Sequence, residues 1–219
     1  MKLKGALYAV LSAVIFGTSP IFFKTIAALG MNTTAQVVVR SAVTMALAAA
    51  LARVKRQPIL LKGRLLADAL IAFVAGQGVT AVLLNSSYAY LPAGMSTSLH
   101  FVYPSVVMLA SVLLFKERIN APKLIALLLS IGAIVLMTDL SAHGQLVGMA
   151  LALGSGCSDA FYILFLERTP LSEIPLWTFT FWSALGCLVA AGVWGISTNA
   201  LNVSGVSFSR SPRAWRTTA

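Results

Sequence analysis

The chain has 219 residues and a formal charge of +10, and 58% of its residues are hydrophobic while only 10% are charged. Soluble domains carry roughly 25% charged residues, so this composition excludes an ordinary soluble domain and predicts that a lipid bilayer surrounds the protein. The excess of cations would suggest nucleic-acid binding in a soluble chain, but here the cations lie in short clusters between apolar runs, as membrane topology signals do, and nucleic acid is not an expected partner.

Seven apolar runs are long enough to cross a bilayer as helices, because a spanning helix needs about 20 mostly apolar residues. In chain order they are Gly5–Ala28, Ala35–Ala52, Ala67–Tyr90, Ala93–Phe115, Ala121–Thr138, Gln145–Leu166 and Pro175–Ile196. The links between them are short, and several contain turn-forming residues. The sequence therefore predicts an all-α integral membrane protein with about seven transmembrane helices.

The basic residues near the ends of these runs fall on one side of the predicted bundle. Alternate links contain eleven cations, which are Lys2, Lys4, Arg53, Lys55, Arg56, Lys62, Arg64, Lys116, Arg118, Lys123 and Arg168. The opposite links contain no Lys or Arg, and they are Gly30–Thr34, Leu91–Pro92 and Asp139–Gly144. Because cytoplasmic loops carry the excess of Lys and Arg, we expect a multi-pass protein of the cytoplasmic (inner) membrane with a cytoplasmic amino terminus.

The segment Ser197–Ala219 differs from the rest of the chain. It contains five serines and three arginines but no apolar run of spanning length, a composition that favours disorder. Seven spans from a cytoplasmic start place this segment outside, where its arginines contradict the charge rule. The tail is either an atypical external segment or the mark of a longer chain interrupted near Ile196, and the abrupt change of composition favours the second interpretation.

A shift of 143 residues places the first apolar run on the sixth. Under this shift four residues coincide with identical ones, and the pairs are Gly5 with Gly148, Ala9 with Ala152, Ser12 with Ser155 and Phe22 with Phe165. Small residues at steps of three and four share one face of a helix. The two copies enter the membrane in opposite directions, which indicates an inverted repeat of the kind found in secondary transporters.

Short motifs also follow one another along the chain. The first run opens with Gly5-x-Leu7-x-Ala9-x-x-Ser12-Ala13-x-x-Phe16-Gly17-x-Ser19, and Asn85-x-x-Tyr88-Ala89 with Ala93-Gly94 joins the third run to the fourth. The fourth run contains Pro104 and ends in Leu113-Leu114-Phe115-Lys116-Glu117-Arg118-Ile119, and Gly132 lies in the fifth. In order and spacing, over about residues 5–195, these motifs resemble those of EamA-type transporters of the drug/metabolite transporter superfamily.

The resemblance implies ten spans in two halves of five. Residues 1–140 would then form a complete five-helix repeat, residues 141–196 the first two helices of an inverted second repeat, and residues 197–219 a polar, basic, disordered tail. It implies a transmembrane transporter, not an enzyme, that exports small metabolites such as amino acids or drugs and uses no cofactor. The alternative is a truncated, transport-inactive or assembly-dependent fragment of such a transporter.

The incomplete second half also predicts loose packing at the carboxyl end. Aromatic side chains of the seventh run would meet lipid or a partner chain where further helices should lie, and they are Trp177, Phe179, Phe181 and Trp182. A homodimer is therefore kept as a hypothesis, and the first five spans are expected to pack better than the last two.

Two neighbouring runs each carry a polar face. The residues that share these faces are Gln77, Asn85 and Tyr88 on the third run and Ser96, His100 and Tyr103 on the fourth. Polar groups within a bilayer usually face the bundle interior or a wet cavity, and Pro104 removes a backbone hydrogen bond next to Tyr103. We interpret Asn85, Tyr88, Ser96, His100 and Tyr103 as substrate-binding candidates. The alternative is that they only join helices by hydrogen bonds.

Charged residues inside the runs complete the candidate site. Asp159 is the one acid well inside a predicted span, and a buried acid in a membrane is a functional-site hypothesis by default. It is a candidate for binding the solute, with Tyr162 one turn later, or for carrying a proton in coupled export. Arg40 lies about a turn and a half into the second run, where it either binds an anionic group of the solute or pairs with an acid of another helix.

Other classes of protein find little support. The two histidines, His100 and His143, form no recognisable motif with a serine or an acid, so hydrolysis is not predicted. The sequence contains no His, Asp and Glu cluster of metal-ligand spacing, and Cys157 and Cys187 are not in CxxC spacing. A retinal protein would need a lysine in its last helix, and the seventh run has none.

Overall fold

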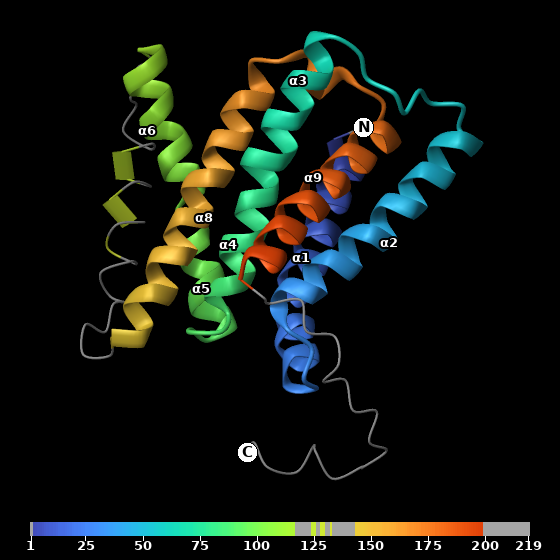
Figure 1. Cartoon of the computed structure of the whole chain (residues 1–219). Coiled ribbons are helices and arrows are strands. Elements are labelled where there is room, and N and C mark those ends of the chain that lie inside the picture. The colour runs from blue at the N-terminus through green and yellow to red at the C-terminus, as the bar shows by residue number, and fades with distance from the viewer. Residues whose placement is uncertain (1, 117–123, 126–127, 130–131, 133–142, 199–219) are drawn as a thin grey trace.

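The computed structural model describes residues 2–116 and 143–198, together with residues 124, 125, 128, 129 and 132. The described part of the chain is all-helical and contains no strand. In chain order its helices are α1 (Lys2–Ala28), α2 (Thr33–Val54), α3 (Arg64–Leu70), the π-helix η1 (Ile71–Gly78), α4 (Val79–Ser87), α5 (Ala93–His100), α6 (Tyr103–Phe115), α8 (His143–Glu167), the 3₁₀-helix η2 (Pro170–Glu173) and α9 (Leu176–Ser197) (Figure 1).

Six stretches of helix are long and apolar enough to cross a membrane. They are Gly5–Ala28, Thr33–Val54, Arg64–Ser87, Ala93–Leu114, Leu146–Glu167 and Leu176–Ser197. These stretches confirm six of the predicted spans to within a few residues and identify an integral, multi-pass membrane protein. The remaining predicted span, Ala121–Thr138, falls mostly outside the described residues, as does the predicted tail beyond residue 198.

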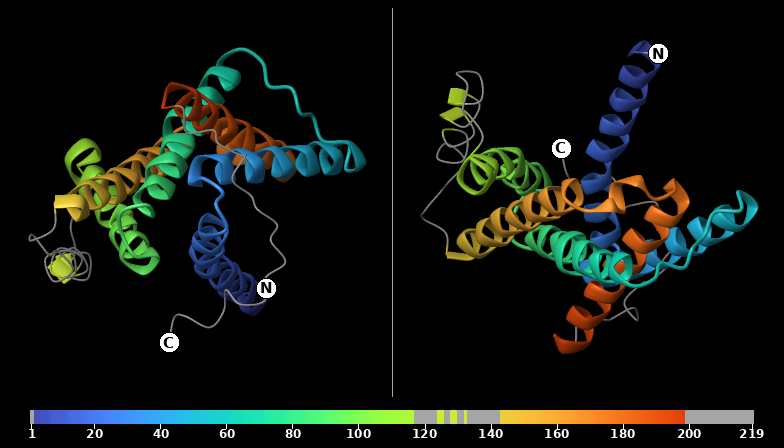
Figure 2. Two further views of the ribbon diagram at one scale, coloured as in Figure 1. Left: turned by 60° about the horizontal axis from the view of Figure 1, so that its bottom comes forward. Right: turned by 90° about the horizontal axis from the view of Figure 1, so that it is seen from above.

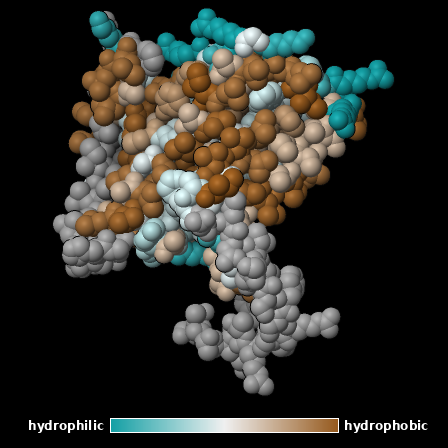
Figure 3. Space-filling model, viewed as in Figure 1, coloured by the Kyte–Doolittle hydropathy of each residue, from teal (hydrophilic) through white to brown (hydrophobic). Residues whose placement is uncertain are grey.

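The surface has the polarity expected of a protein in lipid. Hydrophobic residues cover the side of the helical bundle, and hydrophilic side chains gather along its upper edge (Figure 3). That edge holds the α2–α3 loop and the α8–α9 connection (Figure 1), two of the links in which the basic residues were counted. The apolar sides therefore suit the bilayer core, and the charged edge suits an interface.

Two of the six spans are interrupted, which the apolar pattern alone did not predict. The third span passes from α3 through the π-helix η1 into α4. A π-helix bonds each N–H to the carbonyl five residues back, so the turns of η1 are wider than those of an α-helix. The fourth span breaks at Phe101–Val102, between α5 and α6, and Pro104 lies in the first turn of α6, where its missing N–H costs no helical bond.

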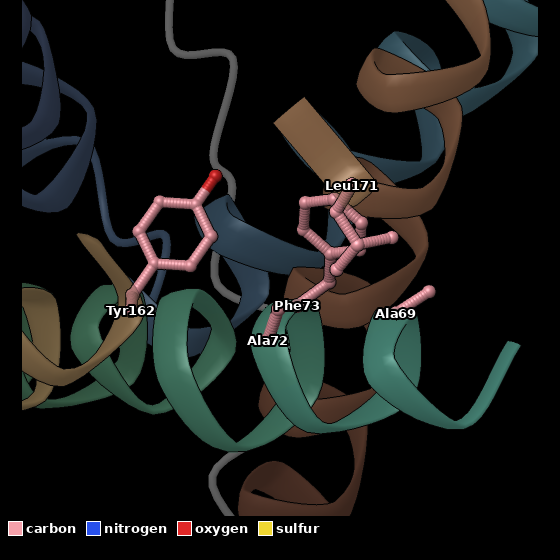
Figure 4. Packing of buried hydrophobic residues seen from close by; sticks show 5 residues of the cluster. All are labelled: Ala69, Ala72, Phe73, Tyr162 and Leu171. Carbon is pink, nitrogen blue, oxygen red and sulfur yellow. The ribbon is translucent and has the colours of Figure 1, made fainter. Parts of the chain in front are cut away.

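The packed core lies where η1 meets α8 and α9. Its buried residues are Ala69, Ala72, Phe73, Tyr162 and Leu171 (Figure 4). The Phe73 ring meets the Phe179 ring edge-on, with centroids 5.0 Å apart, an arrangement favoured by the aromatic quadrupole. The third, sixth and seventh predicted spans thus share one core.

Glycines allow these helices to approach closely. A Cβ added at Gly186 of α9 would overlap the backbone carbonyl of Phe73, and one at Gly78 would lie 2.7 Å from the Ala190 Cβ. A Cβ at Gly76 would lie 2.9 Å from the Cβ of Tyr162 in α8. Since lipid tails are as apolar as the helix surfaces, helix association in a membrane depends on such close packing of small residues.

The expectation of loose packing at the carboxyl end is wrong. The start of α9 is tied to the α2–α3 loop by three hydrogen bonds, from the Trp177 N–H to Gln57 Oε1 (3.0 Å), from Thr178 Oγ1 to the Pro58 carbonyl (2.7 Å) and from Trp182 Nε1 to the Ile59 carbonyl (2.8 Å). None of the four aromatic residues predicted to meet lipid is exposed. The carbonyl groups of the α2–α3 loop and the close-packed glycines therefore cover α9, where the sequence had predicted that further helices were needed.

Among the six spans that the structure describes, the least covered is α1. None of the apolar window of Gly5–Ala28 is buried, and Figure 2 shows α1 diverging from the other helices toward its amino terminus. Its links to the bundle include the hydrogen bond from Lys24 Nζ to the Leu91 carbonyl, at 2.8 Å. The Gly30 turn, with φ of 94°, and the N-cap bond from the Thr34 N–H to Asn32 Oδ1 then start α2.

The close approach at Gly186 yields a stability prediction. Substitution Gly186→Ala places a methyl group against the Phe73 carbonyl, so we expect it to destabilise the folded state by about 1–3 kcal/mol and to lower the thermal unfolding midpoint in detergent. The matched control is Gly192→Ala on the same helix, where an added Cβ has nothing within 4 Å. Equal midpoints for the two variants would show that the α9–η1 contact does not limit stability.

Candidate functional site

A polar cavity of about 220 Å³ lies within the helical bundle. Its walls come from α1, α2, η1, α4, α5, α8 and α9, and the lining residues are Ser19, Pro20, Phe23, Arg40, Gln77, Thr80, Ala81, Leu84, Asn85, Tyr88, His100, Asp159 and Cys187. The structure thus brings five of the predicted site residues together, although they lie on four different predicted spans. They are Arg40, Asn85, Tyr88, His100 and Asp159.

Three predicted site residues do not line this cavity. Ser96 is fully buried one turn before His100, and its hydroxyl has no hydrogen-bond partner. The Tyr103 ring lies next to the His100 ring, with ring centroids 5.6 Å apart. Tyr162 is buried in the η1–α8–α9 core against Phe73, with centroids 6.1 Å apart. These residues adjoin the cavity wall rather than forming it.

His100 joins α5 to α8 through two contacts. Its Nδ1 lies 2.9 Å from the Oγ of Ser155, and its Nε2 lies 3.8 Å from Oδ2 of Asp159. Ser155 and Asp159 are four residues apart on one face of α8, the spacing that places side chains one above the other. The fully buried Ser155 therefore holds one edge of the imidazole while Asp159 faces the other.

The hydrogen bond of Ser155 fixes the proton on His100. The Ser155 hydroxyl donates to the Ala152 carbonyl at 2.6 Å, so it has no second proton to offer and must accept from Nδ1–H. Nε2 is then left facing the Asp159 carboxyl group. Their separation is longer than a hydrogen bond, and one proton can lie on either group, as neutral imidazole with carboxylic acid or as imidazolium with carboxylate.

The same arrangement argues against a serine hydrolase. In a nucleophilic triad the histidine accepts the hydroxyl proton, whereas here the Ser155 proton goes to a backbone carbonyl. Ser155 is also completely buried, away from any solute. Ser155, His100 and Asp159 therefore do not have the arrangement of a catalytic triad. Ser155 positions His100, and His100 and Asp159 are the acid–base pair.

Two amide side chains of the third span lie on the cavity wall. Asn85 Nδ2 donates to the Ala81 carbonyl at 2.7 Å, and its buried Oδ1 accepts no hydrogen bond. Gln77 Oε1 accepts from Ser183 Oγ at 2.6 Å, which joins η1 to α9. The Tyr88 hydroxyl lies 3.5 Å from Thr97 Oγ1. The wall therefore combines amide and hydroxyl groups with the charges of Arg40 and Asp159.

Arg40 is the cation of the cavity. Its guanidinium carbon lies 5.1 Å from the centroid of the Phe23 ring, a cation–π contact between α2 and α1. In the described part of the chain no carboxylate lies within ion-pair distance of Arg40. Two alternatives were open for Arg40, namely binding an anionic group of the solute and pairing with an acid of another helix. Among the described residues, no acid is placed for the second.

The sequence pattern placed Ser155 among the small residues that share one face of the sixth run, an arrangement typical of a close-packed seam between helices. That seam exists, because a Cβ added at Gly148 would lie 2.7 Å from Leu91 and Tyr90, and Ala152 and Ser155 are both fully buried. The i, i+4 spacing of Ser155 and Asp159 was a signal that both could face one partner. That partner is His100, which lies 55 residues away in the sequence and is brought to Ser155 by tertiary packing.

The described residues also include side chains of the types that bind metal ions, and two cysteines. Within them, no group of three or more His, Cys, Asp or Glu side chains is placed to hold a metal ion. Cys157 is exposed and Cys187 is buried on the cavity wall, and both are free thiols.

A bundle of membrane-crossing helices around a polar, charged cavity has the form of a membrane transporter. The family model described as the EamA-like transporter family matches residues 3–139. The chain is also 27% identical over 140 residues to YvbV, an uncharacterized transporter of Bacillus subtilis (strain 168), in a match that covers 62% of this chain and 45% of that relative. No solved structure matches the chain. The chain belongs to the EamA-like transporter family, as the sequence motifs indicated.

The Ser155–His100 contact yields a second prediction. Substitution Ser155→Ala leaves the His100 Nδ1–H buried without an acceptor, so we expect a loss of stability of about 1–3 kcal/mol. Combined with His100→Phe, it should cost less than the sum of the two single changes, by about 0.5–3 kcal/mol. Denaturant unfolding of the purified protein in detergent measures all three.

The matched control is Ser197→Ala, since Ser197 also donates to the carbonyl three residues back but at an exposed position. It should be nearly neutral, alone and with His100→Phe. Strictly additive losses for Ser155 and His100 would show that the hydroxyl does not hold the imidazole.

Proposed function

We propose that the protein is a carrier, not an enzyme, which exports a small metabolite or drug across the cytoplasmic membrane. The observation that carries this proposal is the polar cavity at membrane depth, in which Arg40, Asn85 and Asp159 from three different spans converge. Charged and amide groups inside a bilayer are costly and mark solute or ion pathways. Membership of a transporter family supports the same conclusion.

The cavity supplies the proposed substrate contacts. Arg40 binds an acidic group of the solute, Asn85 Oδ1 accepts a hydrogen bond after a small side-chain movement, and Tyr88 offers its hydroxyl. Ser96, Tyr103 and Tyr162 are proposed to act from behind the wall, by holding α5, His100 and Asp159 in place. Asn85 has a free acceptor, and no acid among the described residues pairs with Arg40. Both observations support a solute with donor and anionic groups.

Proton coupling is proposed for His100 and Asp159. Their shared proton can leave when the cavity opens to one side and return when it opens to the other, which is the task of a relay acid in a transporter. The other titratable groups on the cavity wall are Arg40, Tyr88 and Cys187. Of these, Arg40 stays charged, so Asp159 and His100 are the groups assigned to the proton.

The arrangement of spans is also part of the proposal. We propose seven transmembrane helices, with residues 1–140 as a complete repeat and residues 141–196 as the start of an inverted second one. The matching small-residue faces of the first and sixth predicted spans support this division, and the family model ends near its boundary, at residue 139. The assembly-dependent alternative, including a homodimer, is supported by the uncovered window of α1.

The coupling proposal is tested by Asp159→Asn. We expect efflux from cells or proteoliposomes to fall at least about tenfold and to lose its dependence on a pH gradient, because an amide cannot release a proton. Asp68→Asn, which removes a carboxylate of α3 outside the cavity, should leave both properties unchanged. Unchanged pH dependence in a transporting Asp159→Asn variant would exclude the proton role.

The orientation is tested by cysteine labelling in intact cells, in a Cys157→Ser background. Leu29→Cys lies at the exposed end of α1, and Leu60→Cys lies in the exposed α2–α3 loop. With the amino terminus in the cytoplasm, an impermeant maleimide should label position 29 from outside and position 60 only after the cells are opened. The reverse pattern would invert the topology.

A further inference from the structure

Arg40 borders three cavities of different character. One is the polar site of about 220 Å³ already described. A second, of about 240 Å³, lies between α2 and α9 and is lined by hydroxyl and amide side chains, and these are Ser41, Thr44, Gln77, Thr180 and Ser183, together with Ala184 and Cys187. The third, of about 300 Å³, lies between α1 and α2. Arg40 is a lining residue of all three.

The cavity between α1 and α2 is an apolar chamber. Its walls are mostly hydrophobic side chains, and these are Phe22, Phe23, Ile26, Met31 and Val39. It shares Ser19, Phe23 and Arg40 with the polar site, so the two spaces adjoin at these side chains and the guanidinium borders both. A single ligand can therefore place different chemical groups on the two sides of Arg40.

The position of Arg40 calls for an anion. It is the eighth residue of α2, about 10 Å along the helix at a rise of 1.5 Å per residue, and the apolar span begins with that helix. A charge at this depth in a membrane is costly, and no carboxylate of the described residues lies within ion-pair distance. The cation–π contact with Phe23 compensates only part of that cost. Arg40 is exposed, so an anion can reach its guanidinium.

We propose that this junction binds an amphiphilic organic anion, with its anionic group on Arg40 and its apolar body in the α1–α2 chamber. The proposal rests on the proposed transport function and names the substrate class of the same site. In the hydroxyl-lined cavity beyond Arg40, the Thr180 and Ser183 hydroxyls already donate to the Leu176 carbonyl and to Gln77 Oε1. The side chains of Ser41, Thr44 and the Gln77 amide supply the hydrogen-bond donors for the remaining oxygen atoms of the anionic group.

Other ligand chemistries fit less well. An organic cation would meet Arg40 at like charge. A small inorganic anion would satisfy the guanidinium but leave the apolar chamber empty. An uncharged apolar molecule would fill the chamber and leave the guanidinium unpaired. Only a molecule with both parts uses the walls on the two sides of Arg40.

The test measures binding of 3-phenylpropionate to the purified full-length protein in detergent by equilibrium dialysis. Two matched probes each lack one feature, namely 3-phenylpropionamide, which lacks the charge, and acetate, which lacks the apolar body. We expect 3-phenylpropionate to bind at least about tenfold more tightly than either. Equal binding of the amide, or no binding of the acid, overturns the proposal.

Variants separate the two halves of the site. Arg40→Gln should weaken binding of 3-phenylpropionate at least about tenfold, with Arg40→Lys less affected, whereas Arg53→Gln at the far end of α2 should have no effect. Val39→Trp should fill the chamber and block binding, whereas Val43→Trp, one turn further on and equally exposed to the outside, should not. Unchanged binding in Val39→Trp would show that the chamber is not used.

This binding assay does not depend on transport. Efflux of another metabolite without binding of 3-phenylpropionate would overturn the substrate class and leave the proposed carrier function standing. Binding with the expected variant pattern but no efflux of any anion would support the junction and contradict the carrier function. The Arg40→Lys and Val39→Trp variants keep the test decisive if Arg40→Gln does not fold.

Discussion

The close approach of α9 to η1 at Gly186 is the contact on which the rest of the structure depends. Water does not drive helices together inside a bilayer, so van der Waals packing of small residues must do so. The missing side chain at Gly186 lets α9 rest on the Phe73 backbone, and Gly76 lets α8 rest against the same π-helix through Tyr162. The third span therefore serves as the platform for both α8 and α9.

That platform also explains where the polar site lies. η1 and α4 carry Gln77 and Asn85 to the cavity, α8 carries Asp159, and α5 ends at His100 where the fourth span breaks. Each buried polar group must find a partner in a medium without water, and Ser155 provides one for His100. Packing of small residues and satisfaction of hydrogen bonds thus meet on one face of α8.

The first and sixth predicted spans show how one pattern can have two outcomes. On α8 the small-residue face is buried, and Gly148 contacts Tyr90 and Leu91. On α1 the corresponding Gly5 has no atom within 4 Å of an added Cβ, and Ser12 is exposed. Small residues permit close packing, but a neighbouring helix must be present before the face is buried.

The sequence by itself determined six helical spans, the transporter family and five of the thirteen cavity-lining residues, because apolar length, basic links and the faces of single helices are local properties. Tertiary structure alone decided that Ser155 holds His100 next to Asp159. It likewise decided that Ser96, Tyr103 and Tyr162 do not line the cavity. It also decided that α9 is well packed and α1 is not. These outcomes depend on which helices become neighbours, and helical periodicity specifies the face a residue shares but not the partner that the face meets.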